Sequence, residues 1–425
     1  MPPPILSEES RRIVKGCVIA LWKNSRDNSG LTADQINQSA GPLRVISSGD
    51  TRAVLGEAGL KAAEDLSKTV LSNSTIKIKF SKAEIERLTD EALLQVLTSQ
   101  PSEIGVAATN ATQALEERLA EDPVEWTIFY PIANLNVLVP EAKMGNVSFY
   151  PASRISVAIE AFRTVLGRQD ATSEESIETS LKGFAIAQTK VSAVDRVQAE
   201  LLAERAVSDA LSALRLIASN RYRGNGLYTD FKGRVWTGTF EIVELSTKSV
   251  GLSHSRIGYT QPLAITERLQ ALLIFRQLSE LLSKSPERRS EWERRIVSGI
   301  RIVGTSLNQT QEGDVLVGMI SGLEALCLEE YSPRKEFLAE RVAHMVGSPG
   351  KNKRDVYRKM KELYTMRSNI VHGQEQEVSP SDLLQITIIT YVCFAKALDT
   401  SPTLPNDGDL FRWFDDQKFP SAANP

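Results

Sequence analysis

An arginine and a histidine that lie close together in the sequence have the chemistry to act on a phosphate group. His372 is one of three histidines among 425 residues, and it follows Arg367 by five positions. Imidazole exchanges protons near neutral pH, and the planar guanidinium binds phosphate oxygens. This pair predicts cleavage of RNA without a metal ion. The alternative is that His372 is a helix cap or a surface residue, which a short motif alone does not exclude.

Residues 354–372 are expected to form one helix that carries both side chains. Apolar residues recur there at three- and four-residue steps, no proline interrupts them, and a glycine follows as the C-terminal stop. His372 would lie in the last turn, where the helix dipole favours the protonated imidazole. Tyr364, Ser368 and His372 share one face of this helix. Arg367 lies about 140° around the helix from His372 and reaches it only because its side chain is long.

A run of cations lies at the start of this helix, in a chain whose formal net charge is only -3. Positive side chains at a helix N-terminus oppose the helix dipole, so they cost stability unless an anionic partner compensates. We expect that partner to be nucleic acid, and the alternative is an ordinary solvated face. The cations are Lys351, Lys353, Arg354, Arg358, Lys359 and Lys361.

Two further charged residues have apolar neighbours in the helices expected before this one. Glu324 is in the middle of the strongly apolar segment 314–330, and Arg341 is in an apolar stripe of the helix that starts near Pro333. Buried charges need partners. Glu324 and Arg341 therefore either form a buried ion pair that holds two helices together or belong to an active site, and the two interpretations are compatible.

These residues resemble a known family. Three motifs occur in order, Leu323-Glu324-Ala325-Leu326, Leu338-Ala339-Glu340-Arg341 and Tyr364-x-x-Arg367-Ser368-Asn369-Ile370-Val371-His372-Gly373. With this combination, roughly residues 263–400 resemble the HEPN superfamily, and most of all its Apea-like branch.

The resemblance implies a helical bundle that pairs into a dimer, with the Arg-x4-6-His motifs of both chains meeting at a composite site. Many members are metal-independent endoribonucleases, found among toxins, phage-defence proteins and RNA-processing factors, and others have lost catalysis and serve as binding or dimerisation modules. Arg367 and His372 would take the catalytic positions, and Ser368 and Asn369 the polar places between them. Catalytic members often carry Asn, Asp or His directly after the arginine, where this chain has Ser368. Tyr364, with the two buried charges described above, would support the site.

Cleavage of RNA through its own 2′-hydroxyl gives a physical reason to expect two chains at the site. A base must remove the 2′-hydroxyl proton, an acid must protonate the leaving 5′-oxygen, and cations must stabilise the charged phosphorane. One helix supplies one histidine and one arginine, and a two-fold dimer supplies two of each. We therefore expect a homodimer or another even-numbered homo-oligomer that acts on RNA, tRNA included.

No metal ion or cofactor is expected. Cys17, Cys327 and Cys393 are far apart, and neither Cys-x-x-Cys nor His-x-x-x-His spacing occurs, so zinc is not predicted. The sequence also has no Gly-x-x-x-x-Gly-Lys phosphate loop and no Gly-x-Ser-x-Gly elbow.

The composition is that of an ordinary soluble protein, with 42% hydrophobic and 24% charged residues, and the length suggests two or three domains. The start Met1-Pro2-Pro3-Pro4 lacks the features of a signal peptide, and no apolar run was expected to reach the length of a membrane span. Three scattered cysteines suit a reducing compartment. We expect a cytoplasmic protein with no membrane partner.

The N-terminal region is expected to mix helices and short strands. The predicted helices are Glu8–Trp22, Thr51–Leu71, Lys82–Thr98, Ser102–Ala120 and a long packing helix at Val191–Ala218, with Ser81 and Thr51 as N-caps. The predicted strands are Thr75–Phe80, Trp126–Tyr130, Asn134–Val139 and Gly145–Tyr150. The aromatic and basic stretch Arg221–Trp236 predicts either a hairpin with inward-packing aromatics or a surface that stacks bases, and His254 is expected in a loop.

The resulting prediction is a mainly α protein. Residues 1–260 form an N-terminal α+β region with a small β-sheet, which senses a trigger or restrains the nuclease. Residues 263–400 form a HEPN-like helical bundle, and residues 401–425 form a tail whose aromatic residues suit docking on the body.

The predicted function is a metal-independent endoribonuclease in anti-phage defence or a toxin-like stress response. The rival is a catalytically silent HEPN module that binds RNA or a partner and dimerises. In a third interpretation the N-terminal region carries the main function and the bundle only dimerises it.

Overall fold

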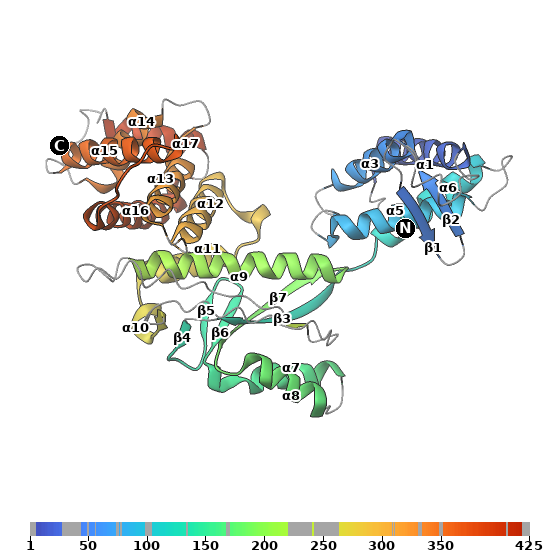
Figure 1. Cartoon of the computed structure of the whole chain (residues 1–425), viewed down its shortest axis with the longest axis horizontal. Coiled ribbons are helices and arrows are strands. Elements are labelled where there is room, and N and C mark those ends of the chain that lie inside the picture. Colours follow the sequence, from blue (N-terminus) through green and yellow to red (C-terminus); the bar gives the residue numbers. More distant parts are fainter. Residues whose placement is uncertain are drawn as a thin grey trace. The chain divides into compact units, whose positions relative to one another are not determined.

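The structure is a computed structural model of the chain. It describes residues 6–27, 44–48, 51–55, 57–73, 76, 79–97, 104–132, 135–166, 171–219, 240–241, 263–307, 309, 311–329, 334–347, 352–404 and 407–418. Helices dominate these residues, and short strands occur in the first two thirds of the chain (Figure 1). The predicted fold class, mainly α with an α+β region that contains a small sheet, is confirmed.

The backbone contacts divide the chain into two compact units. Unit 1 comprises residues 1–126 and 191–202, and unit 2 comprises residues 127–190 and 203–425. The helix α9 (Arg196–Ser219) therefore contributes its first residues to unit 1 and the remainder to unit 2.

Unit 1 is a small helical unit with one hairpin. Its core is built from apolar residues at helical spacing, among them Val14, Val18, Leu66, Ile85 and Leu115. The elements are α1 (Glu8–Asp27), β1 (Arg44–Ser48), β2 (Thr51–Leu55), α3 (Glu57–Leu71), α5 (Lys82–Leu97) and α6 (Ile104–Leu119). The strands β1 and β2 pair antiparallel.

Two local predictions in unit 1 are wrong, and one is confirmed. Residues 51–55 form a strand rather than the first turns of a helix, so Thr51 is not an N-cap. The alternating segment at 75–80 is helical where it is described, because the Phe80 N–H donates to the Ile76 carbonyl over 2.9 Å. Ser81 does cap α5, since its hydroxyl accepts from the Glu84 N–H over 3.1 Å.

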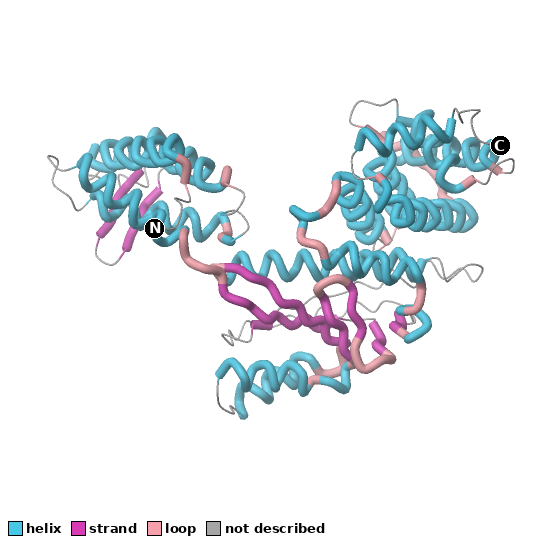
Figure 2. Tube along the Cα trace, turned by 180° about the vertical axis from the view of Figure 1, so that it is seen from behind, coloured by secondary structure: helices cyan, strands magenta, loops and turns pink. Residues whose placement is uncertain are grey.

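Unit 2 contains a sheet with the strand order β5-β6-β7-β3-β8, and a further pair in which β4 and β9 are parallel. The helices α7 and α8 lie on one side of this sheet and α9 runs along the other (Figures 1 and 2). The strands are β3 (Val124–Ile132), β4 (Leu135–Val137), β5 (Ala142–Met144), β6 (Val147–Tyr150), β7 (Ala185–Ala193), β8 (Phe240–Glu241) and β9 (Leu263–Ile265). The helices are a 3-10 turn at Ala152–Arg154, α7 (Ser156–Leu166) and α8 (Ala171–Leu181).

The strand β7 was not anticipated. It takes up the first residues of the predicted helix at 191–218, so α9 begins only at Arg196. The segment is rich in alanine, which has a low strand propensity, and its pairing with β6 places it in the sheet.

The rest of unit 2 is a helical bundle. Apolar faces pack α12 against α13, α14 against α15, and α16 against both α13 and α14. The helices are α10 (Glu267–Gln270), α11 (Leu273–Ser283), α12 (Glu291–Ser306), α13 (Glu312–Cys327), α14 (Arg334–Val346), α15 (Lys353–Val371), α16 (Pro380–Thr400) and α17 (Asp407–Lys418), with 3-10 turns at Pro286–Arg288 and Ser401–Thr403.

Glycines let α12 and α13 approach closely. A Cβ atom placed on Gly322 would lie 2.4 Å from Val303 Cγ2, and one on Gly318 would lie 2.1 Å from Ser306 Cβ. A Cβ atom placed on Gly299 would lie 2.7 Å from Phe394 Cζ of α16. This close packing sets the position of α13, which carries Glu324.

The two units found from backbone contacts are not separated near residue 260, where the sequence predicted a domain boundary. The strand β9 pairs with β4, and α11 packs against β5, so the sheet and the bundle belong to one unit. Part of the predicted tail is a helix, α17, which packs on α12 and α14. The aromatic and basic stretch at 221–236 and His254 lie outside the described residues.

One helix among the described residues is long and apolar enough to cross a membrane. The segment Pro380–Thr403 reaches a mean hydropathy of 1.3, which the sequence analysis did not anticipate. Half of its apolar window is buried inside the protein, as in the core helix of a bundle.

Candidate active site

Glu324 of α13 and two residues of α15 form a connected polar group inside the bundle. The Tyr364 hydroxyl donates to Glu324 Oε1 over 3.0 Å, and Arg367 Nη2 lies 3.4 Å from Glu324 Oε2. The guanidinium carbon of Arg367 also lies 5.6 Å from the centre of the Tyr364 ring. The side chains of Glu324 and Arg367 are only 13% and 19% exposed. The carboxylate therefore orients Arg367 in a largely desolvated place, where a charge pair is stronger than in water.

The Arg367 guanidinium still has donors to offer. A guanidinium carries five N–H groups, and Glu324 engages one nitrogen. Arg367 Nε is buried and has no hydrogen-bond partner in the described part of the chain. Arg367 is thus incompletely satisfied, as expected of a group that binds an added oxyanion.

His372 is the C-terminal cap of α15, and its side chain is exposed. Its backbone N–H donates to the Ser368 carbonyl over 3.0 Å, and Gly373 follows with φ 74°, a left-handed conformation that suits glycine. The predicted position of His372 in the last turn of this helix is thereby confirmed.

Within one chain, Arg367 and His372 have different surroundings, and Arg367, which was expected to reach His372, pairs with Glu324. Arg367 points to Glu324 within the bundle, whereas His372 lies in solvent at the helix end. Their Cα positions differ by about 140° around α15, which accounts for the divergence.

The two polar residues between them have different environments. Asn369 fixes the segment after the helix through two hydrogen bonds. Its side-chain amide donates to Gln376 Oε1 over 3.0 Å, and its backbone carbonyl accepts from the Gln374 N–H over 2.9 Å. Ser368 is half-buried, and its carbonyl accepts the His372 N–H. Asn369 therefore supports the backbone that carries His372.

The predicted ion pair between Glu324 and Arg341 is wrong. Arg341 Nη1 donates to the Cys327 carbonyl over 2.6 Å, and Arg341 Nη2 lies 3.7 Å from Glu329. Cys327 ends α13 and Arg341 lies in the middle of α14, so this bond joins the end of one helix to the body of the next. Glu324 instead pairs with Arg367, because its side chain points toward α15.

Arg341 serves the docking of the C-terminal helix rather than the candidate active site. Its guanidinium carbon lies 4.7 Å from the centre of the Phe411 ring and 5.2 Å from that of Phe414, both on α17. The same guanidinium carbon also lies 5.6 Å from the centre of the Phe337 ring of α14. Cation–π contacts of this kind stabilise a partly desolvated guanidinium by about 1–2 kcal/mol.

Most of the cations at the start of α15 have partners inside the chain. Three of them pair with carboxylates, which neutralise part of the positive charge on which the predicted RNA contact relied. Lys353 Nζ lies 3.2 Å from His344 Nδ1, Arg358 pairs with Asp355, Lys359 with Asp382, and Lys361 with Glu336. Arg354 is exposed, and Lys351 lies outside the described residues.

Comparison with family models, curated proteins and solved structures found no match. No cluster of three or more histidine, cysteine, aspartate or glutamate side chains that could hold a metal ion occurs among the described residues.

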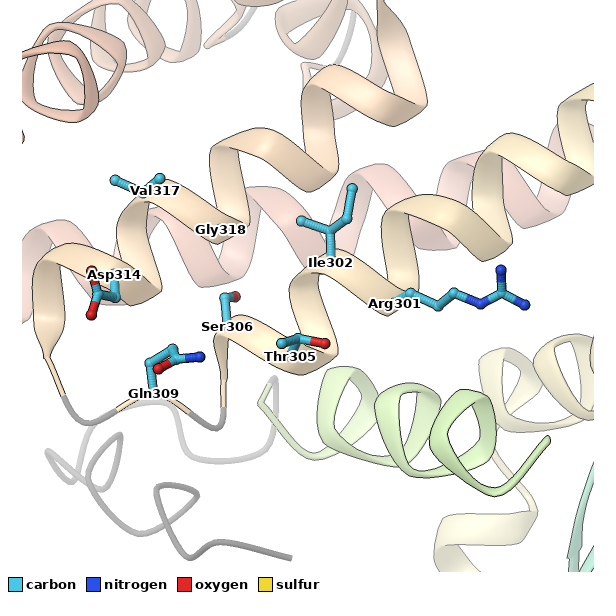
Figure 3. Close-up of a pocket in the computed structure, with 8 residues that line it drawn as sticks. All are labelled: Arg301, Ile302, Thr305, Ser306, Gln309, Asp314, Val317 and Gly318. Atoms are coloured by element: carbon cyan, nitrogen blue, oxygen red, sulfur yellow. The ribbon is translucent and has the colours of Figure 1, made fainter. Parts of the chain in front are cut away.

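A separate hollow of about 590 Å³ lies between the end of α12 and the start of α13 (Figure 3). None of the candidate active-site residues lines it. Arg301 extends along its edge and forms a bidentate ion pair with Asp209 of α9, with N–O distances of 2.5 and 2.7 Å. This arginine is satisfied by its partner and fixes α9 against α12. Neither Arg301 nor Asp209 was predicted from the sequence.

His344 is a further polar residue that the sequence analysis missed. It lies on α14 between Lys353 Nζ at 3.2 Å and Glu340 at 4.0 Å. Burial and the neighbouring Lys353 lower the pKa of the His344 imidazole. The spacing of Glu340 and His344, four residues apart on one helix, is a signal that could have indicated their contact.

Proposed function

We propose that this protein is a metal-independent endoribonuclease of the HEPN type, with Arg367 and His372 as catalytic residues. The observation that carries the proposal is that Glu324 and Tyr364 orient a largely buried arginine on the helix that ends at an exposed histidine. These are the two residue types that RNA cleavage requires, and both lie on one rigid element.

In the proposed reaction the 2′-hydroxyl of RNA attacks the adjacent phosphorus. A neutral histidine removes the 2′-hydroxyl proton while the P–O2′ bond forms, and a protonated histidine gives its proton to the 5′-oxygen while the P–O5′ bond breaks. Arginine stabilises the extra negative charge of the phosphorane. The products are a 2′,3′-cyclic phosphate and a 5′-hydroxyl, and no oxidant or metal ion takes part.

The site needs two copies of the chain. Arg367 and His372 diverge within one chain, and one histidine cannot be both base and acid in the same step. A two-fold dimer that apposes the C-terminal ends of two α15 helices supplies two histidines and two arginines. By resemblance to HEPN proteins, the proposed setting is anti-phage defence or a toxin-like stress response in the cytoplasm.

The test is cleavage of total RNA and purified tRNA in the presence of EDTA, with analysis of the product ends. Wild-type protein should produce 2′,3′-cyclic phosphates, and Arg367→Ala and His372→Ala should each abolish cleavage. Arg276→Ala, at an exposed arginine of α11, is the matched control and should cut normally. Failure of the wild type on every RNA, or full activity in both variants, would reject the nuclease.

A second candidate function is a catalytically silent HEPN module that binds RNA or a protein partner. The observation that favours it is the ion pair between Arg367 and Glu324, which gives the arginine a structural role. In that case RNA would bind without being cut, and Arg367→Ala would lower the melting temperature while RNA affinity stayed the same.

A further inference from the structure

The hollow between the end of α12 and the start of α13 has the size and the lining of a site for a small flat group. Its volume of about 590 Å³ lies in the usual range for ligand sites, about 300–1,000 Å³. Two half-buried apolar side chains, Ile302 of α12 and Val317 of α13, form part of its walls. The polar side chains of Thr305, Gln309 and Asp314 also line it (Figure 3). Such a lining suits a ring with apolar faces and polar edges.

The close contact of α12 and α13 gives the hollow a fixed shape. Ser306 and Gly318 both line it, and a Cβ placed on Gly318 would lie 2.1 Å from Ser306 Cβ. The Gln309 N–H donates to the Ser306 carbonyl over 2.9 Å and thereby fixes the chain after α12. Asp209 holds Arg301 at the edge of the hollow. A site that is ordered before binding loses less entropy when a ligand binds.

Among the charged residues that line the hollow, Asp314 alone lacks a partner in the described part of the chain. Its side chain is exposed, and its carboxylate forms no ion pair or hydrogen bond there, whereas Arg301 pairs with Asp209. Asp314 lies in the first turn of α13, where the helix dipole stabilises a negative charge without a cationic partner. The hollow therefore offers a carboxylate that can accept hydrogen bonds from a ligand.

The hollow lies at the end of α13 that packs against the last turns of α15. Gly313 directly precedes Asp314, and a Cβ placed on Gly313 would lie 3.5 Å from Ile370 Cδ1. Ile370 precedes His372 by two residues on α15. An RNA whose cleaved phosphate lies at His372 would therefore have a neighbouring nucleotide within reach of the hollow.

The unpaired carboxylate indicates which part of that nucleotide the hollow suits. A carboxylate repels phosphate, so the hollow does not suit the RNA backbone. Single-stranded RNA exposes the Watson–Crick edges of its bases to protein side chains. Guanine presents two adjacent donors on this edge, N1–H and the N2 amino group, and they match the two oxygens of a carboxylate. Adenine, cytosine and uracil present no such pair.

We propose that this hollow binds a guanine base of the RNA substrate, with Asp314 accepting hydrogen bonds from N1–H and from the N2 amino group. The assignment depends on the nuclease function proposed above, because the bound nucleotide lies next to the one that is cut. The amide of Gln309 donates to guanine O6, and the faces of the ring contact Ile302 and Val317. The enzyme then cuts RNA at a fixed position relative to guanine.

The decisive experiment measures binding to oligonucleotides that cannot be cut. The probes are fluorescent hexanucleotides of 2′-deoxyuridine that carry one internal guanine, one internal adenine or neither, and the full-length protein is titrated into each while fluorescence anisotropy is followed. The guanine probe should bind at least about tenfold more tightly than the other two, since a good pair of contacts to a base edge discriminates against the wrong base.

Asp314→Asn should remove this difference, because its amide would present a donor to the donors of guanine. Asp415→Asn, at an exposed carboxylate of α17, is the matched control and should keep the preference of the wild type.

Equal affinity for the three probes, no binding of any of them, or an unchanged preference in Asp314→Asn would overturn the guanine site. GMP that bound as tightly as the guanine probe would assign the hollow to a free nucleotide rather than to RNA. These outcomes do not depend on cleavage, because the probes lack the attacking 2′-hydroxyl.

Sequencing of the 2′,3′-cyclic phosphate ends from the nuclease assay gives a separate readout. Wild-type cuts should be enriched for guanine at one fixed position relative to the cleaved bond, and Asp314→Asn should lose that enrichment. Cuts without any base preference would contradict the guanine site and leave the nuclease intact. Guanine-dependent binding without any cut would reject the nuclease and leave the hollow as a guanine site in bound RNA.

Discussion

Glu324 is the residue on which the orientation of Arg367 depends. It accepts a hydrogen bond from Tyr364 and lies 3.4 Å from the Arg367 guanidinium, and both charged side chains are largely buried. Removal of one partner from such a pair leaves the other charge without compensation, which costs more than loss of the attraction alone.

Glu324→Ala should therefore lower the free energy of unfolding by about 1–3 kcal/mol and reduce RNA cleavage, because Arg367 loses its support. Urea denaturation and a cleavage assay on the same preparation measure both effects. Glu362→Ala is the control, since Glu362 is 65% exposed in a surface pair with Lys359. It should change stability by no more than about 0.5 kcal/mol. A Glu324→Ala protein with wild-type stability and activity would separate Glu324 from the site.

His344 links the ends of two helices through its titratable ring. Its pKa is lowered by burial and by Lys353, so the folded protein favours the neutral imidazole. The unfolded chain binds a proton more readily, with a pKa of about 6.5.

The stability contributed by neutral His344 should be fully present above about pH 6.5 and should be lost as the pH falls toward the lowered folded pKa. Thermal melts across pH 5 to 8 should show this slope in the wild type. His344→Gln cannot titrate and should flatten the slope, and Lys353→Ala should reduce it by removing one cause of the shift. An identical slope in all three proteins would assign the pH dependence to other groups.

At the scale of elements, the close contact of α12 and α13 controls where Glu324 lies. Gly322 faces Val303, and Gly318 faces Ser306, at distances that exclude any Cβ. An added methyl group must push the helices apart or shift side chains from their preferred rotamers.

Gly322→Ala should destabilise the protein by about 1–3 kcal/mol, because its Cβ would lie 2.4 Å from Val303 Cγ2 and 3.0 Å from the Gly299 carbonyl oxygen. Chemical denaturation measures the free energy of unfolding of the variant and of the wild type. Gly313→Ala on the same helix is the control, since its Cβ would lie at an ordinary 3.5 Å from Ile370. It should be neutral or slightly stabilising. A Gly322→Ala protein as stable as Gly313→Ala would show that the helices can relax without cost.

At the scale of the whole molecule, the proposed chemistry requires assembly. The exposed His372 and the inward-pointing Arg367 do not form a complete site in one chain. Unit 2 presents the end of α15 on its surface, where a second copy could meet it.

The protein should be a dimer or an even-numbered oligomer by sedimentation equilibrium, and its RNA cleavage should fall upon dilution below the dissociation constant. An excess of His372→Ala chains mixed with wild-type chains should lower the cleavage rate per wild-type chain, because each mixed dimer holds a single histidine. The same excess of Arg276→Ala chains is the control and should not lower it. A monomer that cleaves RNA at all concentrations would contradict the composite site.

The elements near the motif were predictable because their signals are local. The helical periodicity of 354–372 and its terminal glycine predicted α15 and the place of His372, and Ser81 predicted the start of α5. Where a local signal conflicted with packing, prediction failed. The alternating residues near Ile76 became helical, and the alanine-rich segment at 185–193 became a strand between its neighbours in the sheet.

The sequence by itself determined the mainly helical class and the helix that carries Arg367 and His372, because periodicity and caps act over a few residues. The sequence also predicted that the long Arg367 side chain reaches His372, whereas in the structure Arg367 pairs with Glu324. Only the tertiary structure decided which charges pair. Glu324 meets Arg367 across 43 positions, and Arg341 meets the end of α13 and the rings of α17 instead of Glu324. Such partners depend on how close the helices pack, and here the glycines of α12 and α13 set that distance.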